Sequence, residues 1–361
     1  MIIFFVIVGY GGMIFVAIAL FFIWGTMWPK TVERLAVLQR DSEARGSASH
    51  PKLKIMTWNV QFFAGREPVF FYDEPSGKAP RAKANREHLA INLKAAAKII
   101  EQQNPDVIFL QEVDDGAKRT YGENQAENLL TLLPPAEWPW VVEAFYWKAL
   151  FVPHPKIFGS VGTKLVTISK LPLERIAHRR ALPEIPASWL RSRFQLKRAM
   201  LEARVADGPW KGLMLINTHL DAFAQGSDTM DKQVAVVHAR LEELDGQGVP
   251  WVIGGDFNLL VPGARELLSE EHRVAYREDR TELAPLLDSF PVFPVARQVL
   301  QEDSFTHWPK DRRVPVPDRC IDYFFHSKSL QLNSGRVLQK EAWEVSDHFP
   351  LVAEWGPRST G

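Results

Sequence analysis

V-I-G-G-D-F-N-L-L, residues Val252–Leu260, is the stretch around which the chain is organised. A short apolar run, 251–253, ends in two glycines, which predicts a buried strand whose end turns or approaches other backbone closely. Asp256 and Asn258 follow two positions apart, so in an extended segment both side chains point to the same side. The pattern therefore places a carboxylate and an amide at one spot, although an Asx-rich turn after a strand has the same appearance.

The composition is that of an ordinary globular protein. Of the 361 residues, 46% are hydrophobic and 24% are charged, and 22 phenylalanines and 12 tryptophans supply material for a core. The 43 basic residues balance the 43 acidic ones, which disfavours tight, sequence-independent binding of nucleic acids. Because Cys320 is the sole cysteine, an intrachain disulfide and a cysteine metal cluster are excluded, and nothing indicates an oxidising compartment.

The N-terminal residues predict a membrane anchor. Ile2–Trp28 is almost wholly apolar, carries no charged side chain and is long enough to cross a bilayer as a helix, with Trp24 and Trp28 at one end as in an interfacial aromatic belt. A cleaved signal peptide is the alternative, but that requires a basic start and a shorter apolar core. We therefore expect a single-pass transmembrane helix over residues 1–29. Basic residues follow this segment, and by the positive-inside rule they weakly favour a cytoplasmic location of the rest of the chain.

Beyond the anchor, a linker and one large domain are predicted. Residues 30–51 are mixed, charged and rich in small side chains, which is typical of a linker, and a globular pattern runs over 52–358. Gln61–Arg86 is rich in glycine and proline and reads as a long loop. Apolar runs predict strands at 53–60, 107–110, 161–173, 195–205, 212–219, 251–256, 320–326 and after 348, and apolar periodicity or a proline stop predicts helices at 89–100, 124–133 and 234–244.

Polar side chains stand at the ends of six of these apolar strands. They are Asn59, Glu112, His219, Asp256 with Asn258, Asp322, and Asp347 with His348. Each alone has an ordinary structural explanation. Asp322, however, lies within an otherwise apolar strand, and a buried aspartate requires a partner such as a histidine.

Together these residue types fit one chemistry. Carboxylates and an amide without cysteine form a hard oxygen site suited to Mg²⁺ or Mn²⁺, and two well-placed histidines are too few for a three-histidine zinc site. A divalent ion neutralises a phosphate and polarises its phosphorus–oxygen bond. Asp256 or a carboxylate-paired histidine would orient or deprotonate the attacking water, and Asn258 with the second histidine would stabilise charge on the phosphorus centre.

The motifs around these residues resemble those of the endonuclease/exonuclease/phosphatase, or DNase I-like, family. In chain order, over about residues 52–356, they are N-V, L-Q-E-V, N-T-H-L, G-G-D-F-N, I-D-Y and S-D-H-F-P. The resemblance implies a four-layer α/β/β/α sandwich, in which two mainly antiparallel sheets face each other with helices outside. Family members include DNase I-like nucleases, abasic-site endonucleases, inositol polyphosphate phosphatases and neutral sphingomyelinases, and the last of these also combine the fold with membrane attachment.

The resemblance also implies a role for each motif residue. Metal ligands would be Glu112, with Asn59 beside it, and Asp347; the catalytic set would be His219, Asp256, Asn258, Asp322 and His348. In that family the residue at Asp256 is read either as the base that activates water or as the acid that protonates the leaving group. His348 is implied to bond Asp322 and contact the phosphate or the water, and Asn258 to contact the scissile phosphate. Abasic-site endonucleases lack the histidine at position 219, so the chain departs from the repair nucleases.

Three substrate classes follow from these observations. A membrane-anchored phosphodiesterase acting on a phospholipid or sphingolipid headgroup ranks first, because the anchor places the site near a bilayer. The loop aromatics Phe62, Phe63, Phe70, Phe71 and Tyr72 would then dip into the interface, or else form a satellite core under the loop.

The other readings are a nuclease, a phosphomonoesterase and an inactive module. A nuclease would use a local basic groove built from Arg175–Arg180, Arg191–Arg198 and Arg312 with Arg313, although such runs usually form solvated faces. A phosphomonoesterase on inositol phosphates ranks last, because residues 220–222 do not match the signatures of those enzymes. A catalytically inactive binding module is the alternative of a different class, and no obligate protein partner is implied.

Overall fold

Two seven-stranded sheets form the body of the protein. The computed structural model describes residues 12–13, 15–18, 20–21, 24–41, 52–66, 70, 83–222, 226–311 and 313–358. The first sheet has the order β13 (Leu330–Val337), β14 (Leu351–Pro357), β3 (Leu53–Asn59), β4 (Val107–Asp114), β6 (Gly159–Ser169), β5 (Trp140–Val152) and β2 (Leu38–Gln39). The second has the order β1 (Val32–Ala36), β7 (Ile176–Ala181), β8 (Ala199–Arg204), β9 (Met214–His219), β10 (Trp251–Asp256), β12 (Asp322–His326) and β11 (Val292–Phe293).

The pairing within both sheets is mainly antiparallel. Only β3 with β4 and β9 with β10 pair in parallel among the described strands. Each parallel pair is joined through a helix, α2 (Arg86–Gln103) or α5 (Thr229–Gly246), as a parallel crossover requires. The expected sandwich of two facing, mainly antiparallel sheets is therefore confirmed.

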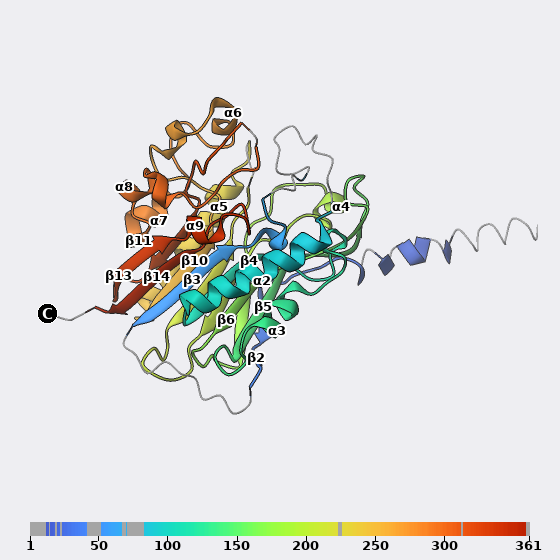
Figure 1. Cartoon of the computed structure of the whole chain (residues 1–361). Coiled ribbons are helices and arrows are strands. Elements are labelled where there is room, and N and C mark those ends of the chain that lie inside the picture. Colours follow the sequence, from blue (N-terminus) through green and yellow to red (C-terminus); the bar gives the residue numbers. More distant parts are fainter. Residues whose placement is uncertain are drawn as a thin grey trace, which may run out of the picture.

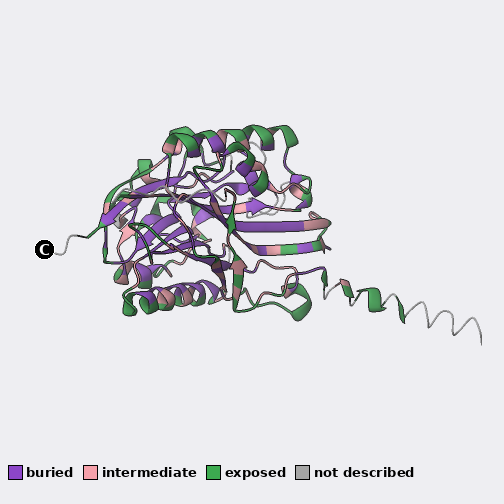
Figure 2. Cartoon of the chain, turned by 90° about the horizontal axis from the view of Figure 1, so that it is seen from below, coloured by how far each residue is buried: buried purple, intermediate pink, exposed green. Residues whose placement is uncertain are grey.

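Three apolar layers hold the sandwich together. α2, α3 (Gln125–Leu132) and α9 (Gln339–Ala342) pack on the outer side of the first sheet, and Figure 1 shows α2 in front of its strands. α5 and α7 (Ala284–Ser289) pack on the outer side of the second. Alternate residues such as Ile55, Phe109, Leu215 and Phe324 fill the space between the sheets. Figure 2 shows the result, with exposed helix surfaces on two outer sides and buried strands between them.

The helix before β4 shows how local sequence sets an element. Asn85 caps α2 by accepting from the backbone N–H of Glu87 at 2.9 Å, a contact that contributes about 1 kcal/mol in a typical helix. Asn104 ends the helix in a left-handed conformation with φ +50°, and Pro105 prevents continuation. The remaining short helices are α4 (Trp189–Ser192), α6 (Glu270–Arg273) and α8 (Ala296–Val299), with 3₁₀ turns η1 (Gln61–Phe63), η2 (Lys118–Thr120), η3 (Ala264–Leu267) and η4 (Glu302–Ser304).

The segment predicted as a linker contributes strands instead. β1 pairs with β7 at an edge of the second sheet, and β2 pairs with β5 at an edge of the first. β5, β7 and β13 also lie outside the predicted strands. β7 and β13 contain many polar or charged residues, whereas β5 is a long apolar run, interrupted only by Glu143 and Lys148, that could have been predicted. Residues 42–51 of the predicted linker lie outside the described residues.

The long loop after β3 does not present its described aromatics to solvent. Phe62, Phe63 and Phe70 are fully buried in the layer beneath α2, so the satellite-core alternative is correct for them and the membrane-dipping one is wrong. Phe71 and Tyr72 lie outside the described residues.

The predicted transmembrane helix was not found. In the described part of the chain no helix has the length and apolar character needed to cross a membrane. Much of the predicted anchor, residues 1–29, lies outside the described residues.

Candidate active site

The strand ends bring the predicted site residues together. In the second sheet, the register sets His219 of β9 and Asp322 of β12 on either side of Asp256 in β10. In the first sheet, β3 ends at Asn59 beside Gln111 of β4. Since the two sheets face each other, residues separated by more than two hundred positions meet at one place.

The two glycines before Asp256 allow β10 to fit between its neighbours. A Cβ on Gly255 would lie 1.9 Å from the carbonyl oxygen of Thr218, so only glycine fits there. The following turn is set by Asp256, whose Oδ1 accepts from the backbone N–H of Asn258 at 2.9 Å. Asn258 has φ +53° and its amide donates to the carbonyl of Leu220 at 3.2 Å, which fixes it beside the strand end.

Asp256 is the centre of the cluster. Its Oδ2 accepts from Nδ2 of Asn59 at 3.0 Å and lies 3.3 Å from Nε2 of His219 and 3.6 Å from Nε2 of His348. The side chain is almost completely buried. Burial raises the pKa of Asp256 to about 7, although the charge of His348 opposes the shift.

The two histidines around this carboxylate are held in different charge states. Nδ1 of His348 lies 2.9 Å from Oδ2 of Asp322, and the hydroxyl of Thr306 donates to the same oxygen at 2.7 Å. Burial lowers the pKa of His348, but the carboxylates of Asp322 and Asp256 outweigh it and raise that pKa to about 10. His348 is therefore the charged histidine of the site.

His219 is the neutral histidine. It is buried, and its Nδ1 lies 3.4 Å from the hydroxyl of Tyr146, whose ring packs edge-on against the imidazole. Burial, together with the charges of Arg198 and His348, holds the pKa of His219 well below its usual value. One carboxylate thus has a cationic and a neutral imidazole within reach.

Glu112 reaches the cluster through a bulge. The register of β4 against β6 slips by one residue between Leu110 and Val113, and Glu112 within this bulge has φ +57°. Its Oε1 accepts from Nδ2 of Asn59 at 3.1 Å, and the side chain is 24% exposed, more than the other acids of the cluster. Backbone strain at a partly exposed carboxylate is frequent at functional sites.

Asp347 joins the cluster through another side chain. Its Oδ2 accepts from Nε2 of Gln61 at 2.6 Å, and Gln61 itself has φ +41° and donates its backbone N–H to Oδ1 of Asn59. All eight predicted site residues therefore belong to one neighbourhood. Asn258 lies at its edge, and Asp347 is one side chain away from Asn59.

The donor set fits a hard divalent cation. Glu112 and Asp347 supply carboxylates, Asn59 supplies an amide, and the buried Oε1 of Gln61 has no hydrogen-bond partner. Asp256, Asp322 and His348 also present ligand atoms within 4.8 Å of one another. In that second group the hydrogen bond between His348 and Asp322 already uses the imidazole, so we favour the Glu112 side for the metal.

Several residues of the neighbourhood carried no signal in the sequence. Thr306 and Tyr146 were missed because neither lies at the end of a predicted strand, and only the fold places them against Asp322 and His219. Gln111 and Asn217 do lie inside the quoted motifs. Their side chains bond each other at 2.7 Å across the two sheets, which fixes the sheets beneath the site.

The predicted basic groove is not formed by the arginines proposed for it. Arg179 is buried and donates to the backbone carbonyls of Phe145 and Lys197, and Arg180 pairs with Glu202. Within the other two runs most described cations are also engaged, through Arg193 to Thr26, Lys197 to Glu184, Arg198 to Asp221 and Arg313 to Asp311, whereas Arg191 is exposed. Arg312 lies outside the described residues.

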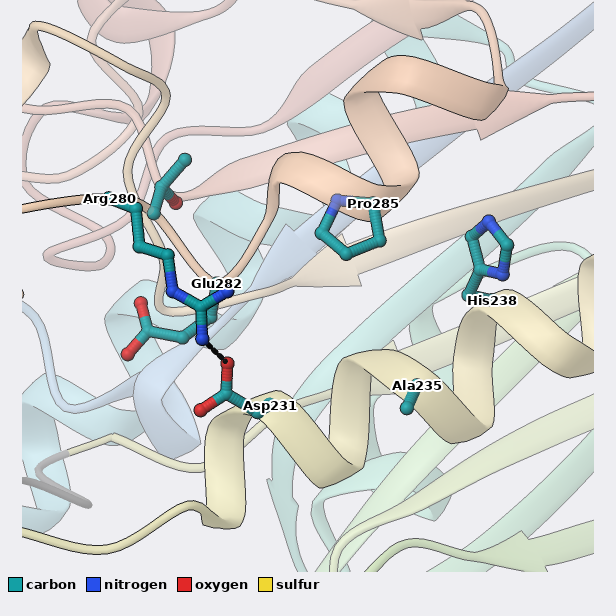
Figure 3. A pocket seen from close by; sticks show the side chains of 7 residues that line it. Asp231, Ala235, His238, Arg280, Glu282 and Pro285 are labelled. Atoms are coloured by element: carbon teal, nitrogen blue, oxygen red, sulfur yellow. Dashed lines mark hydrogen bonds and ion pairs between the residues drawn. The ribbon is translucent and has the colours of Figure 1, made fainter.

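Two surface hollows lie away from the cluster. The first has a volume of about 190 Å³ and lies between α5 and the segment leading to α7 (Figure 3), with Asp231, Ala235, His238, Arg280, Thr281, Glu282 and Pro285 around it. Arg280 is paired with Asp231 at 3.2 Å, and neither this hollow nor the adjoining one of about 320 Å³ contains a residue of the cluster. Since the charges compensate each other, we assign no ligand to them.

Comparison with known proteins gives a family and a fold. The model of the Endonuclease/Exonuclease/phosphatase family matches residues 56–348. No curated protein matches the sequence. Among solved structures, an endonuclease/exonuclease/phosphatase from Beutenbergia cavernae DSM 12333 is 20% identical, with a TM-score of 0.54 over 85% of this chain and 72% of that one.

Two further solved structures show the same fold. An endonuclease/exonuclease/phosphatase family protein from Leptotrichia buccalis C-1013-b is 16% identical, with a TM-score of 0.52 over 83% of this chain and 98% of that one. D. rerio TDP2 complexed with single strand DNA product is 17% identical, with a TM-score of 0.51 over 84% of this chain and 99% of that one.

Proposed function

Because the chain belongs to the endonuclease/exonuclease/phosphatase family, and is therefore a metal-dependent phosphoric ester hydrolase, we propose that it cleaves a phosphodiester by attack of water at the cluster around Asp256. The single observation that carries the proposal is the contact of one buried carboxylate with an amide and with two imidazoles, one cationic and one neutral. A purely structural ion pair would not require the second, neutral imidazole.

Each side chain has a task in this reaction. Asp256, with a pKa near neutrality, accepts a proton from the attacking water, or returns one to the leaving group. His348 remains protonated because it is paired with Asp322, and it stabilises the negative charge that develops on the phosphoryl oxygens. His219 and the amide of Asn258 supply further hydrogen bonds to the phosphate.

A divalent cation completes the site. Glu112, Asn59 and Asp347 would hold Mg²⁺ or Mn²⁺, with the unpartnered Oε1 of Gln61 as a further oxygen donor. When bound, the ion neutralises phosphate charge and polarises the scissile bond.

For the substrate we propose the headgroup of a phospholipid or sphingolipid. The apolar run Ile2–Trp28 supports this choice, since we propose that it anchors the protein in a membrane with the domain on the cytoplasmic side. The zero net charge and the engaged arginines also argue against a groove for a nucleic-acid backbone.

A nuclease is the second candidate. It is favoured by the likeness to D. rerio TDP2, whose structure holds a single strand DNA product. A phosphomonoesterase acting on inositol phosphates is the third, with no described feature in its favour.

The test is a substrate panel. Full-length protein with Mg²⁺ is offered sphingomyelin, phosphatidylinositol, plasmid DNA, inositol phosphates and bis(p-nitrophenyl) phosphate. His348→Ala is compared with the matched control His88→Ala, at a half-buried position in the first turn of α2, outside the cluster. We expect lipid turnover that requires the metal, is lost in His348→Ala and persists in His88→Ala. Rapid cleavage of DNA with lipids untouched would refute the lipid substrate, and full activity of His348→Ala would refute the site.

A further inference from the structure

One end of the molecule exposes a group of large apolar side chains. Trp28, Leu150, Phe158, Trp189 and Leu190 are each exposed by half or more, between 50% and 67%. We call these five residues the aromatic face. Exposed apolar groups of this size on one side of a protein mark an interaction surface.

The face is continuous because three segments are fastened together there. Thr26 forms an antiparallel bridge with Ala149 of β5, next to Leu150. Arg193, directly after α4, donates to the Thr26 hydroxyl at 3.0 Å, and its guanidinium stacks on the ring of Trp28 at 3.1 Å. The N-terminal segment, the end of β5 and α4 are therefore one unit.

The hairpin between β5 and β6 supplies the remaining member. Phe158 packs edge-on against Phe151 at 4.8 Å between ring centroids, above a small core of Ala149, Val152 and Val161. This small core holds the hairpin in place, so the exposed ring of Phe158 has a defined position on the surface.

The charges of the same segments have one sign. Residues 24–32, 144–160 and 185–198 contain no aspartate and no glutamate, whereas they include Lys30, Lys148, Lys156 and Arg191. The glutamates that border these ranges, Glu33, Glu143 and Glu184, each pair with a buried cation. The chain as a whole is neutral, so the bias is local. Aromatic side chains interspersed with lysine and arginine, without acids, are typical of surfaces that lie at the headgroups of an anionic bilayer.

The sequence that precedes the face is itself apolar. Residues 2–23 carry no charged side chain, and the chain continues from them into Gly25 and Thr26 at this end of the molecule. In Figure 1 the N-terminal segment leaves the body on the side where α4 lies. A lipid bilayer is a partner that could bind both the aromatic face and this uncharged apolar segment.

The face borders the catalytic cluster. Tyr146, which contacts His219, lies four residues before Leu150 on β5. The backbone N–H of Lys197 donates to the Tyr146 carbonyl at 2.6 Å, so the segment that follows α4 also runs to the site. A surface touching this face would therefore lie beside the cluster.

We propose that the aromatic face rests on the surface of a lipid bilayer, at the level of the headgroups, and presents the catalytic cluster to lipids of that bilayer. The identity of the substrate rests on the proposed function, but the docking itself does not. The face then acts as a second membrane contact, separate from the N-terminal run.

The buried thiol of Cys320 permits a direct test with site-specific labels. Full-length Phe158→Cys and Trp189→Cys are labelled with an environment-sensitive fluorophore in vesicles of phosphatidylcholine and phosphatidylserine that contain a lipid-borne quencher. Leu300→Cys is the matched control, because Leu300 is exposed and follows α8 at the opposite end of Figure 1. We expect quenching at 158 and 189 but not at 300.

Each outcome decides a separate question. Equal exposure to water at the three positions overturns the docking, and protection that appears only at high protein concentration, without quenching, assigns the face to a second copy of the chain. Quenching at 158 and 189 in a protein that hydrolyses no lipid would keep the docking and refute the lipid substrate. A charge on the face, Trp189→Glu with Leu190→Glu, should lower turnover of vesicle lipids about tenfold while hydrolysis of bis(p-nitrophenyl) phosphate is unchanged. Equal loss on both substrates would contradict a membrane role.

Discussion

Replacing Asp322 by asparagine tests the charge state of the catalytic histidine. Oδ2 of Asp322 accepts from Nδ1 of His348 at 2.9 Å and from the hydroxyl of Thr306 at 2.7 Å, while Oδ1 has no partner. An amide oxygen still accepts from Thr306, and the shape of the side chain is kept. Asp322→Asn therefore removes the negative charge that keeps His348 protonated and leaves the fold intact.

The magnitude follows from the bond that is lost. A hydrogen bond with charged partners contributes about 1.5–3 kcal/mol, which corresponds to a fall of about one to two units in the pKa of His348. That pKa is raised to about 10 in the native protein, so it moves toward neutral pH in the variant. If protonated His348 stabilises the transition state, kcat should fall by about 10- to 150-fold.

The assay is the pH dependence of kcat/KM with bis(p-nitrophenyl) phosphate at saturating Mg²⁺. The alkaline limb should move to lower pH by about one to two units in Asp322→Asn, with a melting temperature close to that of the parent protein. Asp303→Asn, at an exposed position in η4, is the matched control and should change neither quantity. An unchanged alkaline limb together with an unchanged kcat would refute the role assigned to His348.

Three further predictions concern the metal, the fold and pH. Glu112→Gln should raise the Mg²⁺ concentration needed for half-maximal activity by about tenfold or more without lowering the melting temperature, and an unchanged titration would remove Glu112 from the metal site. Gly255→Ala should lower the free energy of unfolding by about 2 kcal/mol or more in a urea titration, because its Cβ would lie 1.9 Å from the Thr218 carbonyl; a variant of parental stability would show that β10 shifts freely. His219 and His307 are held neutral by burial, with each pKa well below 6.5, so the unfolded chain binds more protons below that pH. Below pH 6.5 each of these histidines should lower the free energy of unfolding by up to about 1.4 kcal/mol per pH unit, while Asp256, whose pKa is raised to about 7, offsets the effect of one of them. Urea midpoints that do not fall between about pH 6.5 and 5 would contradict this net effect.

The fold class and the residues of the site could be predicted from the amino-acid sequence alone. An apolar run that ends in G-G-D-F-N or N-T-H-L predicts a strand that ends at a polar side chain. Only a few adjacent residues are needed for this prediction. The same holds for α2 and α5, whose periodicity predicted helices that the structure contains. The early strands β1 and β2 were missed because a short edge strand is specified by its partner and not by its own residues.

The distances between the site residues, and the charge that each residue carries, depend on the folded structure. Asp256 is 66 positions from Asp322 and 197 from Asn59. The register of β10 against β12 fixes the first pair, and the packing of the two sheets fixes the second. Burial in that packing raises the pKa of Asp256 and lowers that of His219, effects that no local motif encodes because desolvation depends on every neighbour. Tertiary contacts also engage Arg179 and Arg180, which the sequence predicted as part of a basic groove. The chemical groups of the site could therefore be identified in the sequence, whereas the distances between them and their charges are set by the folded protein.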